Sequence, residues 1–70
     1  MRKRAVKETI GCRLRLTRKA LGISQRDAAK QIGITPVYLC FLEHDQHEPS
    51  LRVLRRIAKV YKTTVGDLMI

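Results

Sequence analysis

The side chains best suited to coordination chemistry lie close together near the middle of the sequence. Cys40 and His44 are four residues apart, a spacing that places a thiol and an imidazole on one face of a helix, and His47 follows shortly after. Thiolate and imidazole groups are common zinc ligands, and a fourth ligand would have to come from Asp45 or Glu48. A zinc site is therefore one interpretation of this stretch.

Patterns of catalytic side chains are not apparent in the sequence. No serine–histidine–acid grouping, glycine-rich phosphate loop or pair of catalytic carboxylates stands out. A chain of 70 residues also leaves little room for a substrate cavity. We therefore expect a protein that binds a partner and is not an enzyme.

The charge of the chain indicates the chemistry of that partner. Fifteen Lys and Arg residues against six Asp and Glu residues give a formal net charge of +9, which suits a polyanion such as nucleic acid. A solvated basic surface is the alternative. A nucleic-acid-binding role for the same stretch competes with the zinc site, and we expect no metal and no cofactor.

The sequence also predicts where the protein works. No run approaches the roughly 20 apolar residues of a membrane-spanning helix, no lipidation signal is present, and the basic start is not followed by the apolar stretch of a secretory signal. Cys12 and Cys40 fall in different predicted helices without a Cys-x-x-Cys pair, which does not support a disulfide framework. We expect a cytoplasmic protein with no membrane partner.

Helices would have to position all of these residues, since no segment shows the alternation of a strand. Apolar residues recur three and four positions apart, and the later segments are preceded by predicted caps at Ser24, Thr35, Ser50 and Thr64. The predicted helices cover about residues 7–21, 25–32, 36–44 and 51–62, with a short fifth helix near the end of the chain. Their predicted inner stripes are Val6, Ile10, Leu14, Thr17 and Leu21, then Ala28, Ala29 and Ile32, then Leu51, Leu54, Ile57, Ala58 and Tyr61. The fold class is therefore all-α.

The second and third helices follow each other through a very short turn. Gly33 ends the second, Thr35 caps the third, and Pro36 occupies a helix position where a missing N–H costs nothing. With Ala29 at the crossing, this is the pattern of a helix-turn-helix, in which the second helix enters the major groove of DNA. An ordinary helical hairpin would share much of it.

A longer string of residues makes the assignment more specific. It consists of Gly22-Ile23-Ser24-Gln25, Ala28-Ala29, Ile32-Gly33-Ile34-Thr35, Tyr38-Leu39, Leu42-Glu43, Pro49-Ser50 and Ile57-Ala58. This string resembles the Cro and phage-repressor-like (Xre-type) family over about residues 8–69. The resemblance implies a compact five-helix lambda-repressor-like domain at residues 8–70 behind a basic arm at residues 1–7. It also implies a buried ion pair between Arg18 and Glu43.

Two helix starts are expected to hold the DNA backbone. Ser24 and Gln25 open the second helix, whose free N–H groups suit a phosphate, and the family likewise places a Gln at the position of Gln25. Arg26 lies on the same outward face, and by analogy Ser50 and Arg52 open the fourth helix near the backbone. Ser24 could be a cap only, and the cations could be plain solvated surface. The basic residues Arg2, Lys3, Arg4 and Lys7 could reach a groove or remain disordered.

The third helix departs from the family's habit. The resemblance makes Thr35, Pro36, Val37 and Phe41 base-facing, with Cys40 and His44 at the margin, where relatives usually carry polar or basic residues. These residues are mostly apolar here, which favours thymine methyl contacts, T-containing half-sites and readout of groove shape.

Several alternatives remain for this apolar helix. Thr35, Tyr38 and His44 could add hydrogen bonds to DNA, although Tyr38 could simply pack its ring. The apolar stripe could instead be a protein-docking surface. Phe41 could also turn inward to fill the space left by Ala28, where the family commonly has Leu. Asp45 stands where the family often has a glycine in the left-handed conformation, which Asp tolerates.

The combined hypothesis is a sequence-preferring transcriptional regulator, of the repressor type, that binds double-stranded DNA. We expect a homodimer on an inverted repeat, with the dimer contact formed by the last apolar residues, Val65, Leu68, Met69 and Ile70. The alternative for these residues is that a longer protein would cover them. Two other function classes stay open: the antitoxin of a toxin–antitoxin pair, and a protein-interaction module that uses the third helix.

Overall fold

Five α-helices make up the part of the chain that the structure describes. The computed structural model describes residues 9–69, and every regular element in that range is helical. The helices are α1 (Ile10–Ala20), α2 (Gln25–Ile32), α3 (Pro36–Glu43), α4 (Leu51–Tyr61) and α5 (Val65–Met69). The predicted all-α fold class is confirmed.

A hydroxyl side chain caps the start of every helix. The side-chain oxygens of Thr9, Ser24, Thr35, Ser50 and Thr64 accept hydrogen bonds from the backbone N–H groups of Cys12, Asp27, Tyr38, Val53 and Asp67, at 3.0–3.2 Å. A cap of this kind is typically worth about 1 kcal/mol, because it satisfies an N–H group that has no partner within the helix. The caps predicted at Ser24, Thr35, Ser50 and Thr64 are confirmed.

Four of the described residues adopt the left-handed conformation between helices, three of them before α4. Gly22 has φ of 73°, Gly33 of 91° and Asp45 of 58°. Gly33 is the C-cap of α2, where the absence of a side chain removes the steric penalty of this conformation. The prediction that Asp45 can replace a glycine after α3 is confirmed.

The ends of three helices differ from the prediction by one to three residues. α1 begins at Ile10 and ends at Ala20, while the predicted start at residue 7 lies outside the described residues. α3 ends at Glu43 with His44 as its cap, and α4 ends at Tyr61 because Lys62 adopts the left-handed conformation, with φ of 57°. The bounds predicted for α2 are correct.

The core forms where these helices face one another. Its fully buried large side chains are Leu14, Leu39, Leu42, Ile57 and Leu68, with Ala28 and Ala29 also at 0% exposure. The core positions predicted at Leu21 and Leu51 are wrong, since these side chains are 43% and 52% exposed. Both lie at a helix end, where a continuing apolar stripe no longer faces a neighbouring helix.

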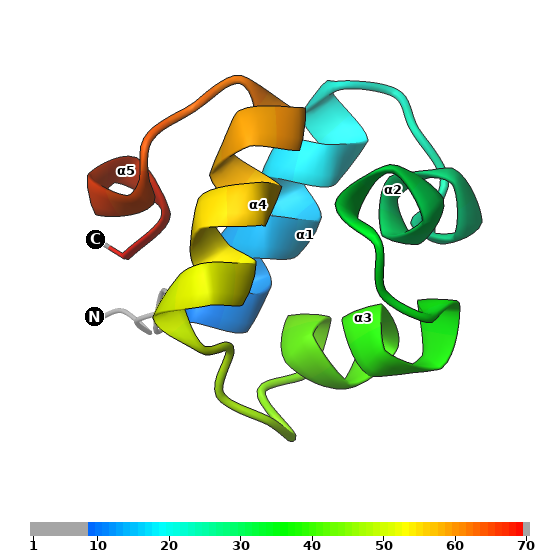
Figure 1. Cartoon of the computed structure of the whole chain (residues 1–70), viewed down its shortest axis with the longest axis horizontal. Coiled ribbons are helices and arrows are strands. Elements are labelled where there is room, and N and C mark those ends of the chain that lie inside the picture. Colours follow the sequence, from blue (N-terminus) through cyan, green and yellow to red (C-terminus); the bar gives the residue numbers. More distant parts are fainter. Residues whose placement is uncertain (1–8, 70) are drawn as a thin grey trace, which may run out of the picture.

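α1 and α4 lie in the middle of the molecule, with α2 and α3 on one side and α5 on the other (Figure 1). α3 packs against both α1 and α2, and α5 packs against α1 and α4. This arrangement fixes α3 along its inner side only. The opposite side of α3 faces away from the core.

A close approach between α1 and the end of α3 holds α3 in place. A Cβ atom built on Gly11 would lie 2.5 Å from the carbonyl oxygen of Leu42 and 2.7 Å from that of Glu43, so only glycine fits. Asp45 completes the junction, because its carboxylate accepts hydrogen bonds from the Thr9 hydroxyl and, at 2.9 Å, from the backbone N–H of Gly11. The carboxylate thus sits at the positive N-terminal end of α1.

Candidate nucleic-acid interface

α2 and α3 form a tight helical pair joined by a turn of three residues, Gly33 to Thr35. Ala28 and Ala29 are completely buried, and their small side chains allow α3 to approach α2 closely. The turn is closed by hydrogen bonds from the backbone N–H groups of Gly33 and Ile34 to the carbonyl oxygen of Ala29, at 2.8 and 3.0 Å. This is the two-helix geometry predicted from the sequence.

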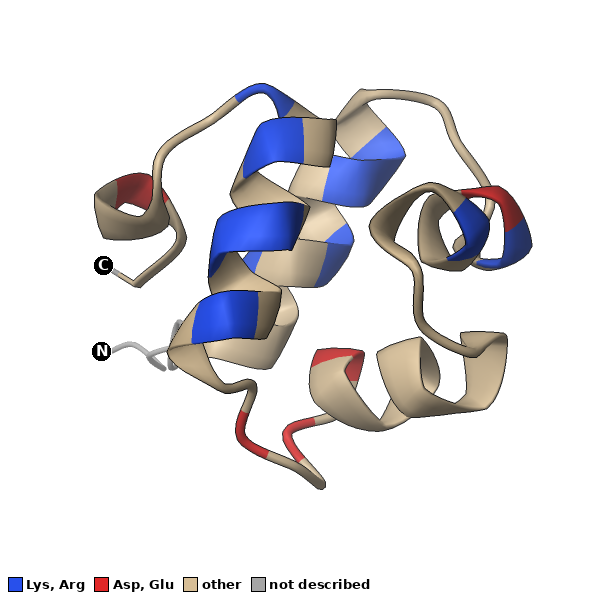
Figure 2. Cartoon of the chain, viewed as in Figure 1, with Lys and Arg blue, Asp and Glu red and all other residues tan. Residues whose placement is uncertain are grey.

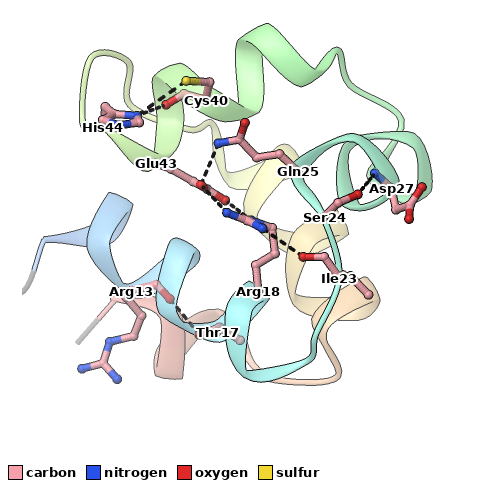
Figure 3. A network of polar contacts seen from close by, with 10 residues as sticks. All are labelled: Arg13, Thr17, Arg18, Ile23, Ser24, Gln25, Asp27, Cys40, Glu43 and His44. Carbon is pink, nitrogen blue, oxygen red and sulfur yellow. Dashed lines mark hydrogen bonds and ion pairs between the residues drawn. The ribbon is translucent and has the colours of Figure 1, made fainter.

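A buried ion pair joins this unit to α1 (Figure 3). Arg18 donates to the two carboxylate oxygens of Glu43, at 2.7 Å from Nε and 3.2 Å from Nη2. Its Nη1 atom donates to the carbonyl oxygen of Ile23, at 2.9 Å. The hydrogen bonds to Glu43 raise the pKa of Arg18 above its usual value, so the guanidinium stays protonated. The ion pair implied by the family resemblance is confirmed.

Gln25 adds a third donor to the same carboxylate. Its Nε2 atom donates to Glu43 Oε1 at 2.9 Å, and its side chain is half-buried (Figure 3). The sequence predicts a DNA contact for Gln25 but not this bond, because the two residues are 18 positions apart and no periodic pattern links them. The bond fixes the side chain at the start of α2, beside the cap formed by Ser24.

The outward face of α3 is apolar and open. Val37 is 62% exposed and Phe41 38% exposed, and Thr35 and Pro36 are exposed beside them. The alternative that Phe41 turns inward is wrong, because its side chain is 38% exposed while Ala28 is fully buried. Tyr38, which is half-buried, packs against the core.

The loop after α3 contributes an imidazole to this surface. The ring of His47 lies 5.6 Å from that of Phe41 and 6.0 Å from that of Tyr38, centroid to centroid. These distances are within the range of favourable aromatic contacts. The loop therefore extends the apolar face of α3 and supports the orientation of Phe41.

Cys40 and His44 meet at the margin of α3, as their spacing predicts. The Sγ atom of Cys40 lies 3.6 Å from Nδ1 of His44, and the same nitrogen lies 2.8 Å from the carbonyl oxygen of Cys40 (Figure 3). His47 is instead engaged by the aromatic rings. Within residues 9–69 no group of three or more His, Cys, Asp or Glu side chains is arranged to hold a metal ion.

Positive charge is distributed around this surface and not on it. The 20 residues from Gln31 to Ser50 contain no Lys or Arg, and Figure 2 shows α3 without basic residues. The predicted backbone contacts Ser24, Arg26, Ser50 and Arg52 are all exposed at the starts of α2 and α4. The predicted basic arm at residues 1–7 lies outside the described residues.

The cations that follow Arg52 on α4 are not among the predicted site residues. Arg55, Arg56 and Lys59 are all exposed. The helical spacing of these basic residues, opposite the apolar stripe of the same helix, is visible in the sequence.

A small cavity of about 250 Å³ lies between Ile10 and the loop at Asp45–Pro49. No helix within residues 9–69 has the length and apolar character needed to cross a bilayer.

Comparisons with known proteins agree with this geometry. A helix-turn-helix family model of the Xre/Cro type matches residues 14–68. An HTH-type transcriptional regulator from Archaeoglobus fulgidus is 36% identical over 58 residues, which cover 83% of this chain and 83% of that protein. The P22 c2 repressor, solved in complex with synthetic operator 9T, has a TM-score of 0.85 and 27% identity, covering 90% of this chain and 96% of that one. The restriction-modification controller protein C.AhdI from Aeromonas hydrophila has a TM-score of 0.83 and 30% identity, covering 86% of this chain and 91% of that one.

The two solved structures share the fold of the present chain over 86–90% of its length. The family model covers well over half of the sequence and includes α2, the turn and α3. The chain therefore belongs to the Cro and phage-repressor-like (Xre-type) family of helix-turn-helix regulators.

Proposed function

We propose that the protein is a sequence-preferring regulator of transcription, of the repressor type, that inserts α3 into the major groove of double-stranded DNA. The observation that carries this proposal is the outward face of α3, which is exposed at Thr35, Pro36, Val37 and Phe41 while its inner face is fixed in the core. A rigid helix with one free face is what the groove accepts. The P22 c2 repressor, solved with a synthetic operator, has the same fold.

Phosphate contacts and base contacts come from different parts of the surface in this proposal. Ser24, Gln25 and Arg26 at the start of α2, and Ser50 and Arg52 at the start of α4, hold the backbone. Gln25 keeps its Nε2 bonded to Glu43, so its contact with DNA is made through the other amide atom, Oε1, or through the backbone N–H groups beside it. These contacts position α3 without reading sequence.

The base-reading side chains are short of hydrogen-bonding groups. Val37, Phe41 and Pro36 offer apolar surface for thymine methyl groups, and Thr35, Tyr38 and His44 offer hydrogen bonds at the edges, with Cys40 beside them. We therefore expect T-containing half-sites, with further discrimination from groove shape and DNA deformability. A site known for another family member should not be transferred, because the reading residues differ.

The functional form in this proposal is a homodimer on an inverted repeat, with half-sites about one helical turn apart. α5 lies on the opposite side of the molecule from α3 (Figure 1), so a twofold contact through α5 would leave both copies of α3 free. In α5 Met69 is 54% exposed, whereas Leu68 is buried and Val65 packs against the core. Among the residues that the structure describes, Met69 is therefore the one proposed to form the dimer contact. Ile70 lies outside the described residues.

The role is one of binding without catalysis or cofactor, in the cytoplasm. Cys12 and Cys40 are both free thiols, which suits a reducing compartment. The arm at residues 1–7 is proposed to add phosphate contacts beside the domain at residues 8–70. A membrane has no part in this function.

A protein partner is the second candidate for the face of α3. Val37 and Phe41 place exposed apolar surface side by side with His47, and exposed apolar patches on small domains often mark protein contacts. A toxin bound by an antitoxin, or another regulator, would fit this face. This candidate predicts that a protein would compete with DNA for α3.

Selection of bound sequences from a random pool of duplex DNA tests the proposed function. We expect enrichment of a twofold-symmetric site with thymines in each half, followed by a steep loss of affinity for the winning duplex as salt rises. Val37→Glu, which places a carboxylate in the groove, should abolish the enrichment without unfolding the protein, since Val37 lies outside the core. A pool that stays random with the wild-type protein would contradict the proposal.

A further inference from the structure

The outer face of α4 carries a dense row of cations, of which the proposed function uses only Arg52. Arg52, Arg55, Arg56 and Lys59 are spaced by three, four and seven residues and are all exposed. This spacing places them on one face of the helix, which we call the α4 basic face. Lys62 continues the row at the C-cap, and no acidic residue occurs between Leu51 and Lys62.

The fold itself does not require this arrangement. The opposite side of α4, formed by Leu54, Ile57, Ala58 and Tyr61, provides the contacts with the core. Like charges three and four residues apart on a helix destabilise it by about 0.2–0.5 kcal/mol per pair. Within residues 9–69 no carboxylate forms an ion pair with the α4 basic face. The charges are therefore uncompensated and face the solvent.

The α4 basic face extends along α4 beyond Arg52, the residue of this face that is proposed to contact the DNA read by α3. Figure 2 shows the basic bands along the whole length of α4, from the end near the α3–α4 loop to the opposite edge of the molecule. Lys59 lies seven residues beyond Arg52, or about 10 Å along the helix axis. The proposed backbone contacts on α4 end at Arg52, so the proposed function assigns no DNA contact to Arg55 and Lys59.

We propose that the α4 basic face is a second, sequence-independent binding site for duplex DNA. Phosphates along one strand are spaced by about 3.4 Å of helix axis, so cations spread over about 10 Å match three or four of them. Arg side chains bind phosphate oxygens in a bidentate manner. A protein held on one duplex by α3 would then bridge to another. The inference goes beyond the proposed function, and it does not depend on how α3 reads bases.

A capture assay tests the bridge directly. The duplex enriched in the selection is immobilised in excess over the protein, so that the α3 surfaces are occupied, and a labelled 25-base-pair duplex of unrelated sequence is added. We expect capture of the labelled duplex at 50 mM salt. With four phosphates neutralised, the affinity for it should fall on the order of a hundredfold between 50 and 200 mM salt.

Two charge-reversed variants separate the α4 basic face from net charge. Arg55→Glu with Lys59→Glu should reduce capture at least tenfold while affinity for the immobilised duplex changes less than threefold. Arg15→Glu with Lys19→Glu removes the same charge from exposed positions on α1 and should leave most of the capture intact. Arg56 is not changed, because its guanidinium lies beside the Gly33 turn.

The outcomes distinguish this inference from the proposed function. Equal capture by the two variants would show that only net charge matters and would overturn the inference. Absence of capture by the wild-type protein, while it remains bound to the immobilised duplex, would overturn it as well. If the wild-type protein enriches no duplex in the selection, the proposed function fails, and capture is then measured with two unrelated duplexes, where the same contrast between variants is expected.

Discussion

Glu43 is the single residue on which the geometry of α2 and α3 most depends. Its carboxylate, buried at the end of α3, accepts hydrogen bonds from Arg18 on α1 and Gln25 on α2. The three helices that build the proposed interface therefore meet at one charged group. A buried charge is tolerated only while its partners remain.

Removal of one member of the ion pair is expected to be costly. Glu43→Gln leaves the Arg18 guanidinium buried without a counter-charge, and we expect the free energy of unfolding to fall by about 3–5 kcal/mol. Urea denaturation measures this change. Arg15→Met is the control, because it removes an exposed Arg from α1, the helix that carries Arg18. In the double variant Arg18→Met with Glu43→Leu, much of the loss should be recovered. The pairing is contradicted if the double variant loses as much free energy of unfolding as Arg18→Met and Glu43→Leu lose separately, added together.

Phe41 is the residue that separates DNA readout from protein docking. If it contacts thymine methyl groups, Phe41→Ala should weaken binding to the selected duplex by about tenfold, near the lower end of the roughly 1–3 kcal/mol of a specific base contact. Fluorescence anisotropy with the labelled duplex measures the change. Leu21→Ala, which trims a comparably exposed side chain away from α3, should leave the affinity unchanged. Unaltered DNA binding by Phe41→Ala would exclude a base-contacting role.

What the sequence can predict at this scale depends on how local the interaction is. The caps at Ser24, Thr35 and Ser50 are correct because each side chain bonds to an N–H group three residues away. The bond from Gln25 to Glu43 was missed because it exists only once α2 and α3 have packed. The pair between Arg18 and Glu43 was anticipated through family resemblance, since their spacing of 25 residues carries no local signal.

At the scale of helices, the junction between α1 and α3 is a point where no side chain fits. Gly11→Ala would place a methyl group against the backbone carbonyl oxygens of Leu42 and Glu43, and neither can move without displacing α3. We expect a loss of about 1–3 kcal/mol in the free energy of unfolding and weaker DNA binding. Gly66→Ala is the matched control, because its Cβ would meet nothing closer than 3.8 Å. A stable Gly11→Ala variant with normal DNA binding would show that α1 does not fix α3.

Tyr61, which is buried on α4, makes the free energy of unfolding depend on pH in the alkaline range. Burial, followed by the nearby charge of Glu43, raises the pKa of Tyr61 from 10.0 to about 12. Below pH 10 the neutral phenol is present in both folded and unfolded chains. Between pH 10 and 12 the unfolded chain ionises first, so the free energy of unfolding falls by about 1.4 kcal/mol per pH unit.

Tyr61→Phe removes this pH dependence. Within residues 9–69 the buried Tyr61 hydroxyl has no hydrogen-bond partner, so at pH 7 the variant should be at least as stable as the wild-type protein, by up to about 1 kcal/mol. Urea denaturation at pH 7, 9, 10 and 11 should show the advantage of Tyr61→Phe growing above pH 10. If the free energy of unfolding falls equally with pH in the two proteins over this range, Tyr61 is not the cause of the alkaline loss of stability.

The elements themselves were largely predictable, and their ends were not. Apolar periodicity with Gly33 and the Thr35–Pro36 pair gave the bounds of α2 and the start of α3 correctly. The same periodicity extended the core to Leu21 and Leu51, which are exposed. A stripe of apolar residues specifies which face of a helix is buried, but only the neighbouring helices determine how far along the helix the burial continues.

For the molecule as a whole, the distribution of charge was harder to predict than its sum. The net charge of +9 indicated a nucleic-acid partner. It did not indicate that α3 and its flanking turns carry no Lys or Arg, while five of the eleven described cations lie on α4 and its cap. The helical spacing of the α4 cations is visible in the sequence, whereas the absence of an ion-pair partner from another helix within residues 9–69 is a property of the fold.

The assembly of two molecules is the last property that the fold constrains. α5 uses Leu68 for the core of its own molecule, so the apolar surface left for a partner is smaller than the sequence suggested. A twofold contact is still self-complementary, and one exposed Met69 on each copy would meet the other near the axis. Such a small contact predicts a weak dimer in free solution that DNA strengthens, because adjacent half-sites hold two copies together.

Sedimentation equilibrium distinguishes this dimer from a monomer. At tens of micromolar we expect a concentration-dependent mixture of the two, shifting to two copies per duplex when the inverted repeat is added. Met69→Glu places two carboxylates near the twofold axis, so the variant should remain monomeric while its affinity for an isolated half-site is unchanged. Leu51→Glu changes an equally exposed side chain at the start of α4 and should still dimerise. A wild-type protein that sediments as a monomer both with and without DNA would exclude the dimer, and an unaffected Met69→Glu variant would move the contact away from α5.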